Sequence, residues 1–189
     1  AGEACDGDGL GTGGETALCN VDCSAAVCGD NKVNTSAGET CDASTGADTA
    51  TCNGNTAGLA SCRAPSCGDG YANGAYTPPG GSPESCDTSG NSQTCNGAAA
   101  GAVACQVPSC GDGYVNDQYT PPGGSPESCD TSGSSQTCNG AGGGAVACQV
   151  PSCGDGYANG AYTPPGGSPE SCDTSGNSQT CNGAGGGAV

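Results

Sequence analysis

A cysteine pattern that repeats along the chain is the feature that most limits how this sequence can fold. Cys67, Cys110 and Cys153 lie 43 residues apart, and the segment CGDGYANGAYTPPGGSPESCD at 67–87 returns unchanged at 153–173. Chains with internal repeats of this length fold as small units that contact only their neighbours. We therefore expect a linear stack of small repeats: a partial divergent repeat at 1–27, repeat 1 (28–66), repeat 2 (67–109), repeat 3 (110–152) and the incomplete repeat 4 (153–189).

The composition does not supply a hydrophobic core for these repeats. Among 189 residues there is no Phe, Trp or Met, while 38 are Gly. Ordering one 43-residue repeat costs about 65 kcal/mol at roughly 1.5 kcal/mol per residue, which burial of Ala and Val does not offset. The 18 Cys residues indicate a disulfide scaffold instead. The sequence thus predicts a disulfide-rich fold of turns and short β-strands, with little regular secondary structure and no hydrophobic core.

Local patterns agree with a fold made of turns. Gly, Pro, Asn and Ser interrupt every stretch, and no window has the period of an amphipathic helix. Two short apolar stretches, 103–107 and 146–150, alternate as strands do. The TPPGGSP segment at 77–83 and its copies predict polyproline backbone that leads into a turn.

Four cysteines per repeat allow three disulfide pairings, and the last cysteines of the sequence favour one of them. If all repeats pair alike and no thiol is left over, Cys172 must pair with Cys181. A zinc-thiolate site is the alternative, although the chain has no His and its Cys-x4-Cys spacings also fit disulfide loops. The predicted disulfides are Cys5–Cys19, Cys23–Cys28, Cys41–Cys52, Cys62–Cys67, Cys86–Cys95, Cys105–Cys110, Cys129–Cys138, Cys148–Cys153 and Cys172–Cys181.

Charge and cysteine content together predict where the protein works. Disulfide scaffolds form in oxidising compartments, so we expect an extracellular protein, secreted or on a cell surface. The net charge of −17 excludes nucleic-acid binding through phosphate contacts and disfavours an anionic membrane surface. No apolar run is long enough for a signal peptide or a membrane span, which predicts a mature chain without membrane insertion.

Three acids recur beside the cysteines of each repeat and predict a metal site. Clustered carboxylates repel one another, and Lys32 and Arg63 are the only basic residues that could offset them. Calcium prefers carboxylate, amide and backbone oxygens, including those of Asn73, Asn116 and Asn159. The alternative is that the acids serve solubility alone. The predicted calcium ligands are Glu3, Asp6, Asp8, Asp30, Glu39, Asp42, Asp69, Glu84, Asp87, Asp112, Glu127, Asp130, Asp155, Glu170 and Asp173.

The order Cys-Gly-Asp-Gly, then Glu-x-Cys-Asp, then two further cysteines resembles the Myxococcus-type cysteine-rich repeat. The pattern recurs at fixed order over nearly the whole chain, for example at 67–70 and 84–87. Repeats of this family occur in tandem in secreted and surface-attached bacterial proteins. The resemblance implies a bacterial, extracellular protein of repeated architecture.

The same features favour a structural role over catalysis. The chain has no His for proton transfer and few large apolar residues to enclose a pocket, so we expect no enzyme. Repeats without distinct caps can accept another copy head to tail and grow a filament or surface fibre. A calcium-dependent adhesive, carbohydrate-binding or spacer module of a larger secreted protein is the alternative, with glycans as partners. The sequon at Asn34 makes this residue a glycosylation candidate.

Overall fold

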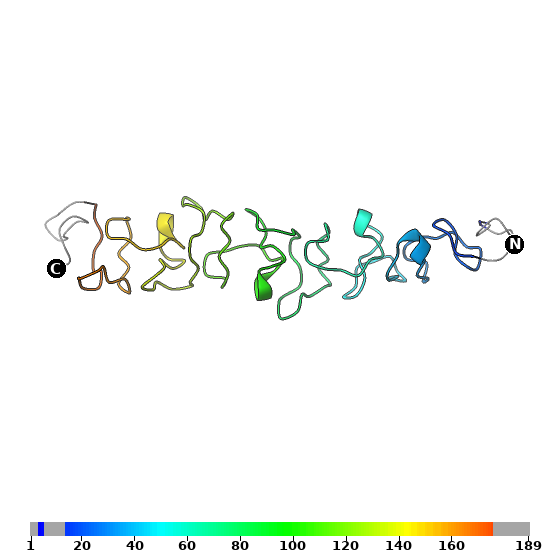
Figure 1. Ribbon diagram of the computed structural model, residues 1–189, viewed down its shortest axis with the longest axis horizontal. Coiled ribbons are helices and arrows are strands. Elements are labelled where there is room, and N and C mark those ends of the chain that lie inside the picture. The colour runs from blue at the N-terminus through cyan, green and yellow to red at the C-terminus, as the bar shows by residue number, and fades with distance from the viewer. Residues whose placement is uncertain (1–3, 6–13, 176–189) are drawn as a thin grey trace. The chain divides into compact units, whose positions relative to one another are not determined.

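The computed structural model describes residues 4–5 and 14–175, and it confirms a disulfide-rich fold with little regular secondary structure. Its helical elements in this part are four short 3-10 turns, seen as coiled ribbons in Figure 1: η1 (Thr35–Ala37), η2 (Gly58–Ala60), η3 (Gly101–Val103) and η4 (Gly144–Val146). The β-structure of the described residues is limited to isolated bridges, Thr16 with Cys19, Cys19 with Ala25, and Thr49 with Cys52.

The strands predicted at 103–107 and 146–150 are wrong. Each stretch instead starts at the end of a 3-10 turn, η3 or η4, and continues into turns. Cys105 and Cys148, at the centres of the stretches, both have a left-handed backbone with φ of 53°. A residue with a left-handed backbone cannot continue an extended strand, because a strand requires a strongly negative φ. The alternation of apolar residues over these short stretches therefore did not identify a strand.

The turn predicted within the TPPGGSP segment is present. The Gly81 N–H donates to the Pro78 carbonyl over 3.0 Å, and Gly80 has a φ of 77°. Pro at the second position and a left-handed Gly at the third are the requirements of a type II turn. The copies in repeats 3 and 4 repeat both the hydrogen bond and the glycine conformation.

The buried side chains are small or polar. In the described part of the chain, the buried apolar residues are Cys, Ala and Pro, while Leu59 is 96 % exposed. The largest side chains with almost no exposed surface are asparagines. Because a buried amide without a partner is costly, these asparagines need a complete set of hydrogen bonds.

An asparagine network supplies these hydrogen bonds and joins successive repeats. Asn73 of repeat 2 donates to the side-chain oxygen of Asn53 in repeat 1 over 2.9 Å. Asn53 in turn donates to Asp69 of repeat 2 over 3.0 Å. The same three-residue arrangement recurs at each described junction, in the sets Asn34–Asn20–Asp30, Asn116–Asn96–Asp112 and Asn159–Asn139–Asp155.

The chain divides into two compact units, and each is described by itself. Unit 1 comprises Ala1–Gly90 and Gly97–Gln106, and unit 2 comprises Asn91–Asn96 and Val107–Val189. Each unit contains two of the asparagine junctions. The division falls within repeat 2, so the compact units do not follow the sequence repeats one to one.

The disulfides are nested within the repeats. The first cysteine of a repeat pairs with the fourth, as in Cys28–Cys62, Cys67–Cys105 and Cys110–Cys148, and the second with the third, as in Cys41–Cys52 and Cys129–Cys138. The outer disulfides close loops of 34 or 38 residues. In the chain-entropy model, a disulfide that closes a loop of that size adds about 4 kcal/mol to the free energy of unfolding. A disulfide across a predicted Cys-x4-Cys loop of about five residues would add about 2 kcal/mol.

Three of the predicted pairs are confirmed: Cys5–Cys19, Cys41–Cys52 and Cys129–Cys138. Cys86, Cys95 and Cys172 are also disulfide-bonded, and Cys181 lies outside the described residues. The pairs Cys23–Cys28, Cys62–Cys67, Cys105–Cys110 and Cys148–Cys153 are wrong, as is the expectation that every cysteine is oxidised. Within the described chain, Cys23 and Cys153 keep free thiols. The assumption that no thiol is left over selected the wrong outer pairing.

The asparagine network predicts that removing a single side-chain amide lowers the stability of the folded chain considerably. Asn116→Ala removes the donor to Asn96 and to the carbonyls of Ser92 and Cys95. We expect a loss of about 2–3 kcal/mol in the free energy of unfolding, because buried acceptors are left unpaired. Denaturant unfolding without reductant, followed by tyrosine fluorescence, measures it. The exposed Gln118→Ala is the control, and equal midpoints for the two variants would contradict the role of the network.

Candidate metal centres

The Cys-Gly-Asp-Gly motif forms a loop that holds a carboxylate from later in the same repeat. In repeat 2, the backbone N–H groups of Gly68 and Gly70 both donate to Asp87, the latter over 2.6 Å. Both glycines have a left-handed φ, 91° and 95°, which turns their N–H groups toward one side. A Cβ at Gly68 would also lie 2.9 Å from the Ser89 Cα, so only glycine fits. The motif is thus a carboxylate-binding loop.

A second carboxylate, from Glu84, is buried next to Asp87. One of its oxygens accepts the Asn73 N–H over 2.8 Å. The other oxygen, Oε1, is buried without a hydrogen-bond partner among the described residues. The hydroxyl oxygen of Thr88, which follows Asp87 in the sequence, is buried and unpartnered in the same sense. A buried oxygen without a donor is a position where a cation or a proton is favourable.

The same pair of carboxylates recurs beside an outer cysteine in each repeat. Ligand atoms within 4.8 Å of one another occur in the groups Glu39–Asp42–Cys62, Cys67–Glu84–Asp87–Cys105, Cys110–Glu127–Asp130–Cys148 and Cys153–Glu170–Asp173. In the first three groups the cysteines belong to disulfides, and a disulfide sulfur is not a thiolate ligand. These three groups therefore offer carboxylate oxygens to a metal ion, and only the last also offers a thiol.

The first acid of each predicted set has another role. Asp69 does not join the Glu84–Asp87 group. It accepts hydrogen bonds from the Asn53 amide and from the backbone N–H groups of Ser66 and Tyr71. Asp30, Asp112 and Asp155 accept from the equivalent asparagines. The structure thus places these four aspartates in the asparagine network and apart from the Glu–Asp groups, and their role as metal ligands stays a prediction.

The asparagine amide oxygens predicted as ligands are engaged as well. The Asn73 Oδ1 accepts the backbone N–H groups of Ala75 and Tyr76 over 2.9 and 3.2 Å. Asn116 and Asn159 make the corresponding contacts. Sequence reasoning missed this structural use of asparagine. The recurrence of Cys-Asn at 52–53, 95–96 and 138–139 was the signal that could have revealed it.

The remaining predicted site residues are the acids near the N-terminus and the glycosylation candidate Asn34. Glu3, Asp6 and Asp8 lie outside the described residues. Asn34 is fully buried, and its amide nitrogen donates to Asn20 and to the carbonyls of Thr16 and Cys19. A glycan on that nitrogen would replace one of its two hydrogens and so remove part of this hydrogen bonding, so the burial does not favour glycosylation of Asn34, which stays a prediction.

The electrostatics of the carboxylate pairs favour a bound positive charge. Burial raises the pKa of Glu127 to about 7, with Asp130 and Asp112 adding to the effect and the Asn116 N–H opposing it. Burial likewise raises the pKa of Glu39, Glu84 and Glu170. A neighbouring divalent cation would favour the ionised carboxylates. These sites can therefore hold either a proton or a metal ion.

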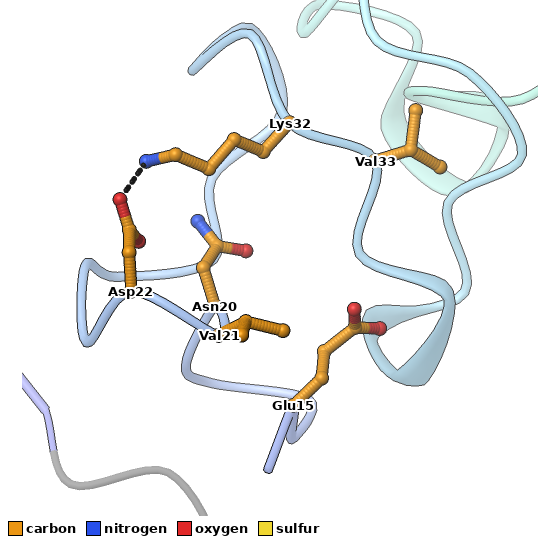
Figure 2. A pocket seen from close by; sticks show the side chains of 6 residues that line it. All are labelled: Glu15, Asn20, Val21, Asp22, Lys32 and Val33. Atoms are coloured by element: carbon orange, nitrogen blue, oxygen red, sulfur yellow. Dashed lines mark ion pairs between the residues drawn. The ribbon is translucent and has the colours of Figure 1, made fainter. Parts of the chain in front are cut away.

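A cavity of about 190 Å³ lies in unit 1, away from the carboxylate pairs. Figure 2 shows its lining, formed by Glu15, Asn20, Val21, Asp22, Lys32 and Val33. Lys32 contacts Asp22 over 2.8 Å and thereby lowers the pKa of Asp22 to about 2. Glu15 accepts from Thr35 and Ser36. The charged groups of this cavity are thus already paired, and the volume is small for a ligand site.

Comparison of the chain with known protein families, curated proteins and solved structures found no match. No helix in the described part is long and apolar enough to cross a membrane. The disulfides indicate an oxidising, extracellular environment. The class defined so far is a disulfide-rich repeat protein with groups that can hold a metal ion.

The buried glutamate predicts an unusual dependence of stability on pH. The pKa of Glu127 rises from its ordinary value of 4.5 to about 7 in the folded chain. The folded chain therefore binds the proton more tightly than the unfolded one, and stability falls as pH rises between these two values. We expect the thermal midpoint in chelator to decrease from pH 4.5 to pH 7.

Glu127→Gln should weaken this decrease, because glutamine cannot ionise. Asp117→Asn, at an exposed position of the same repeat, is the matched control and should retain it. Midpoints that rise with pH over the same interval would contradict the burial of an acid without a positive partner. The measurement is thermal unfolding by circular dichroism at a series of pH values.

Proposed function

We propose that this protein is a structural repeat protein of an extracellular fibre or surface stalk. The observation that supports it is the recurrence of one set of contacts at successive repeat junctions, from Asn20 and Asn34 to Asn139 and Asn159. Each repeat binds the preceding one with the same amide and carboxylate groups. Each further repeat lengthens such a protein without changing the contacts between neighbouring repeats, so the repetition suits a protein whose function depends on its length.

Covalent closure of each repeat suits this function. The outer and inner disulfides, such as Cys110–Cys148 and Cys129–Cys138, limit how far a repeat can open under load. A chain without large buried apolar residues has little else to resist unfolding. Disulfides also survive outside the cell, where fibres and stalks act. Catalysis is not part of the proposal.

Calcium is the metal proposed for the carboxylate pairs of repeats 1 to 3. Two oxygens within 4.8 Å of each other can share an ion that lies about 2.3–2.6 Å from each. The unpartnered Oε1 atoms of Glu84 and Glu127 provide buried, hard oxygen ligands. Calcium would neutralise acids that have no Lys or Arg in their group and would stiffen each repeat.

Sedimentation velocity of the oxidised protein, in millimolar calcium and then in EGTA, tests the proposal. We expect large assemblies in calcium that dissociate or become more flexible in EGTA. A Glu39→Gln, Glu84→Gln, Glu127→Gln triple variant should behave in calcium as the natural chain behaves in EGTA, because each of the three pairs loses one charged ligand. Asp48→Asn with Asp117→Asn is the control, since neither residue belongs to a carboxylate group.

Electron microscopy of the same samples distinguishes the outcomes. Filaments whose length grows with protein concentration support self-assembly from copies of this chain. A compact monomer in both buffers would contradict a fibre. A thermal midpoint that calcium does not raise would contradict the calcium sites alone, because an ion that binds the folded state must stabilise it.

A further inference from the structure

Two buried oxygen atoms that lack a hydrogen-bond partner among the described residues occur together in repeats 2 and 3. In repeat 2 they are the Oε1 of Glu84 and the Oγ1 of Thr88, and in repeat 3 the corresponding atoms of Glu127 and Thr131. Glu84 and Glu127 are only 5 % and 3 % exposed. Buried oxygens without a donor are unfavourable, so their occurrence at the same two positions of both repeats points to a ligand that they share.

The glutamate and the threonine both lie close to the aspartate of the carboxylate pair. Oxygens of Glu84 and Asp87 are within 4.8 Å of each other, and Thr88 directly follows Asp87. The next residue, Ser89, packs against the glycine loop, because its Cα would lie 2.9 Å from a Cβ at Gly68. The Gly68 N–H also donates to Asp87. The loop thus holds the aspartate and the chain around the threonine, and the aspartate oxygen keeps a second lone pair for a cation.

Repeat 1 has neither of these two atoms. Ala43 stands where repeats 2 and 3 have threonine, and no oxygen of Glu39 is both buried and unpartnered in the described chain. The chain after Asp42 also takes another path. Gly46, four residues after this aspartate, packs against the glycine loop at Gly29, where repeats 2 and 3 use the second residue after the aspartate. The pair in repeat 1 therefore offers carboxylate oxygens without a hydroxyl.

We propose that the hydroxyl oxygens of Thr88 and Thr131 are calcium ligands, so that repeats 2 and 3 bind calcium more tightly than repeat 1. This inference rests on the calcium sites of the proposed function. Calcium takes about six to eight oxygen ligands at about 2.3–2.6 Å, and a hydroxyl adds a neutral oxygen that does not repel the two carboxylates. The hydroxyl binds the ion through a lone pair and keeps its proton. Water and backbone carbonyls complete the coordination.

Each site has a backbone amide that reports on it separately. In each repeat one N–H donates to the glutamate of the pair over 2.8–2.9 Å, and these amides belong to Asn34, Asn73 and Asn116 in repeats 1, 2 and 3. The oxidised, isotope-labelled full chain is titrated with calcium chloride and followed by nuclear magnetic resonance. We expect the Asn73 and Asn116 resonances to move at a calcium concentration at least about tenfold below that needed for Asn34, since even an outer-shell partner of a metal site changes affinity that much.

Single variants test the hydroxyl itself. Thr88→Val removes the oxygen and should raise the calcium midpoint of Asn73 at least about tenfold. It should leave the midpoint of Asn116 unchanged, so that repeat 3 is the control within the same molecule. Thr131→Val should have the opposite pattern, and Thr88→Ser, which keeps the oxygen, should behave as the natural chain. Thr94→Val removes an exposed hydroxyl of repeat 2 and should change neither midpoint.

The outcomes separate this inference from the proposed function. Equal midpoints for the three amides of the natural chain would overturn the inference and leave the calcium sites in place. So would an Asn73 midpoint that Thr88→Val leaves unchanged, or an Asn116 midpoint that the same variant raises equally. Three amides that do not respond to millimolar calcium would overturn the calcium sites themselves. The comparison of the amides within the natural chain needs no variant and therefore holds even if a substitution disturbs folding.

Discussion

The hydrogen bonds of buried asparagine side chains are the interaction on which the rest of this structure depends. The buried apolar residues in the described part of the chain are Cys, Ala and Pro, and the amide of Asn73 or Asn116 occupies the position that a large hydrophobic side chain fills in other proteins. An amide surrounded by fixed acceptors specifies one geometry, because any shift leaves several buried groups unpaired at once. The network therefore determines how each repeat meets the one before it, and it uses Asp69 and its equivalents as acceptors.

The potential to bind a metal ion comes from the carboxylate oxygens that receive no hydrogen bond from this network. Backbone N–H groups and asparagine amides satisfy most of the carboxylate oxygens, but the Oε1 atoms of Glu84, Glu127 and Glu170 receive no donor from the described residues. Burial then makes the charged form of these acids unfavourable unless a cation approaches. Where the neighbouring cysteines form a disulfide, the group offers carboxylate oxygens to a cation.

Much of this architecture could be predicted from the residue pattern. The shortage of large apolar residues and the number of cysteines predicted a disulfide-rich fold with little regular secondary structure. The assumption that all repeats pair alike predicted the inner pair Cys41–Cys52 correctly. The outer pairing failed because a Cys-x4-Cys spacing is compatible with a local loop, while the turn at Cys105, with its left-handed φ, points the sulfur toward Cys67 instead. Such a backbone conformation has no signature in the sequence when the residue is not glycine.

The sequence by itself determined the repeat, the reliance on disulfides in place of a hydrophobic core and the oxidising environment, because these follow from spacing, composition and the chemistry of cysteine. Only the tertiary structure decided which acids stand together. Asp69 and Asp87 both lie within two residues of a cysteine in the sequence, yet Asp69 accepts from the asparagine network and Asp87 joins Glu84. The two aspartates differ because folding surrounds them with different N–H donors, from another repeat in one case and from the glycine loop at 68–70 in the other. A carboxylate is stabilised by the N–H groups that donate to it.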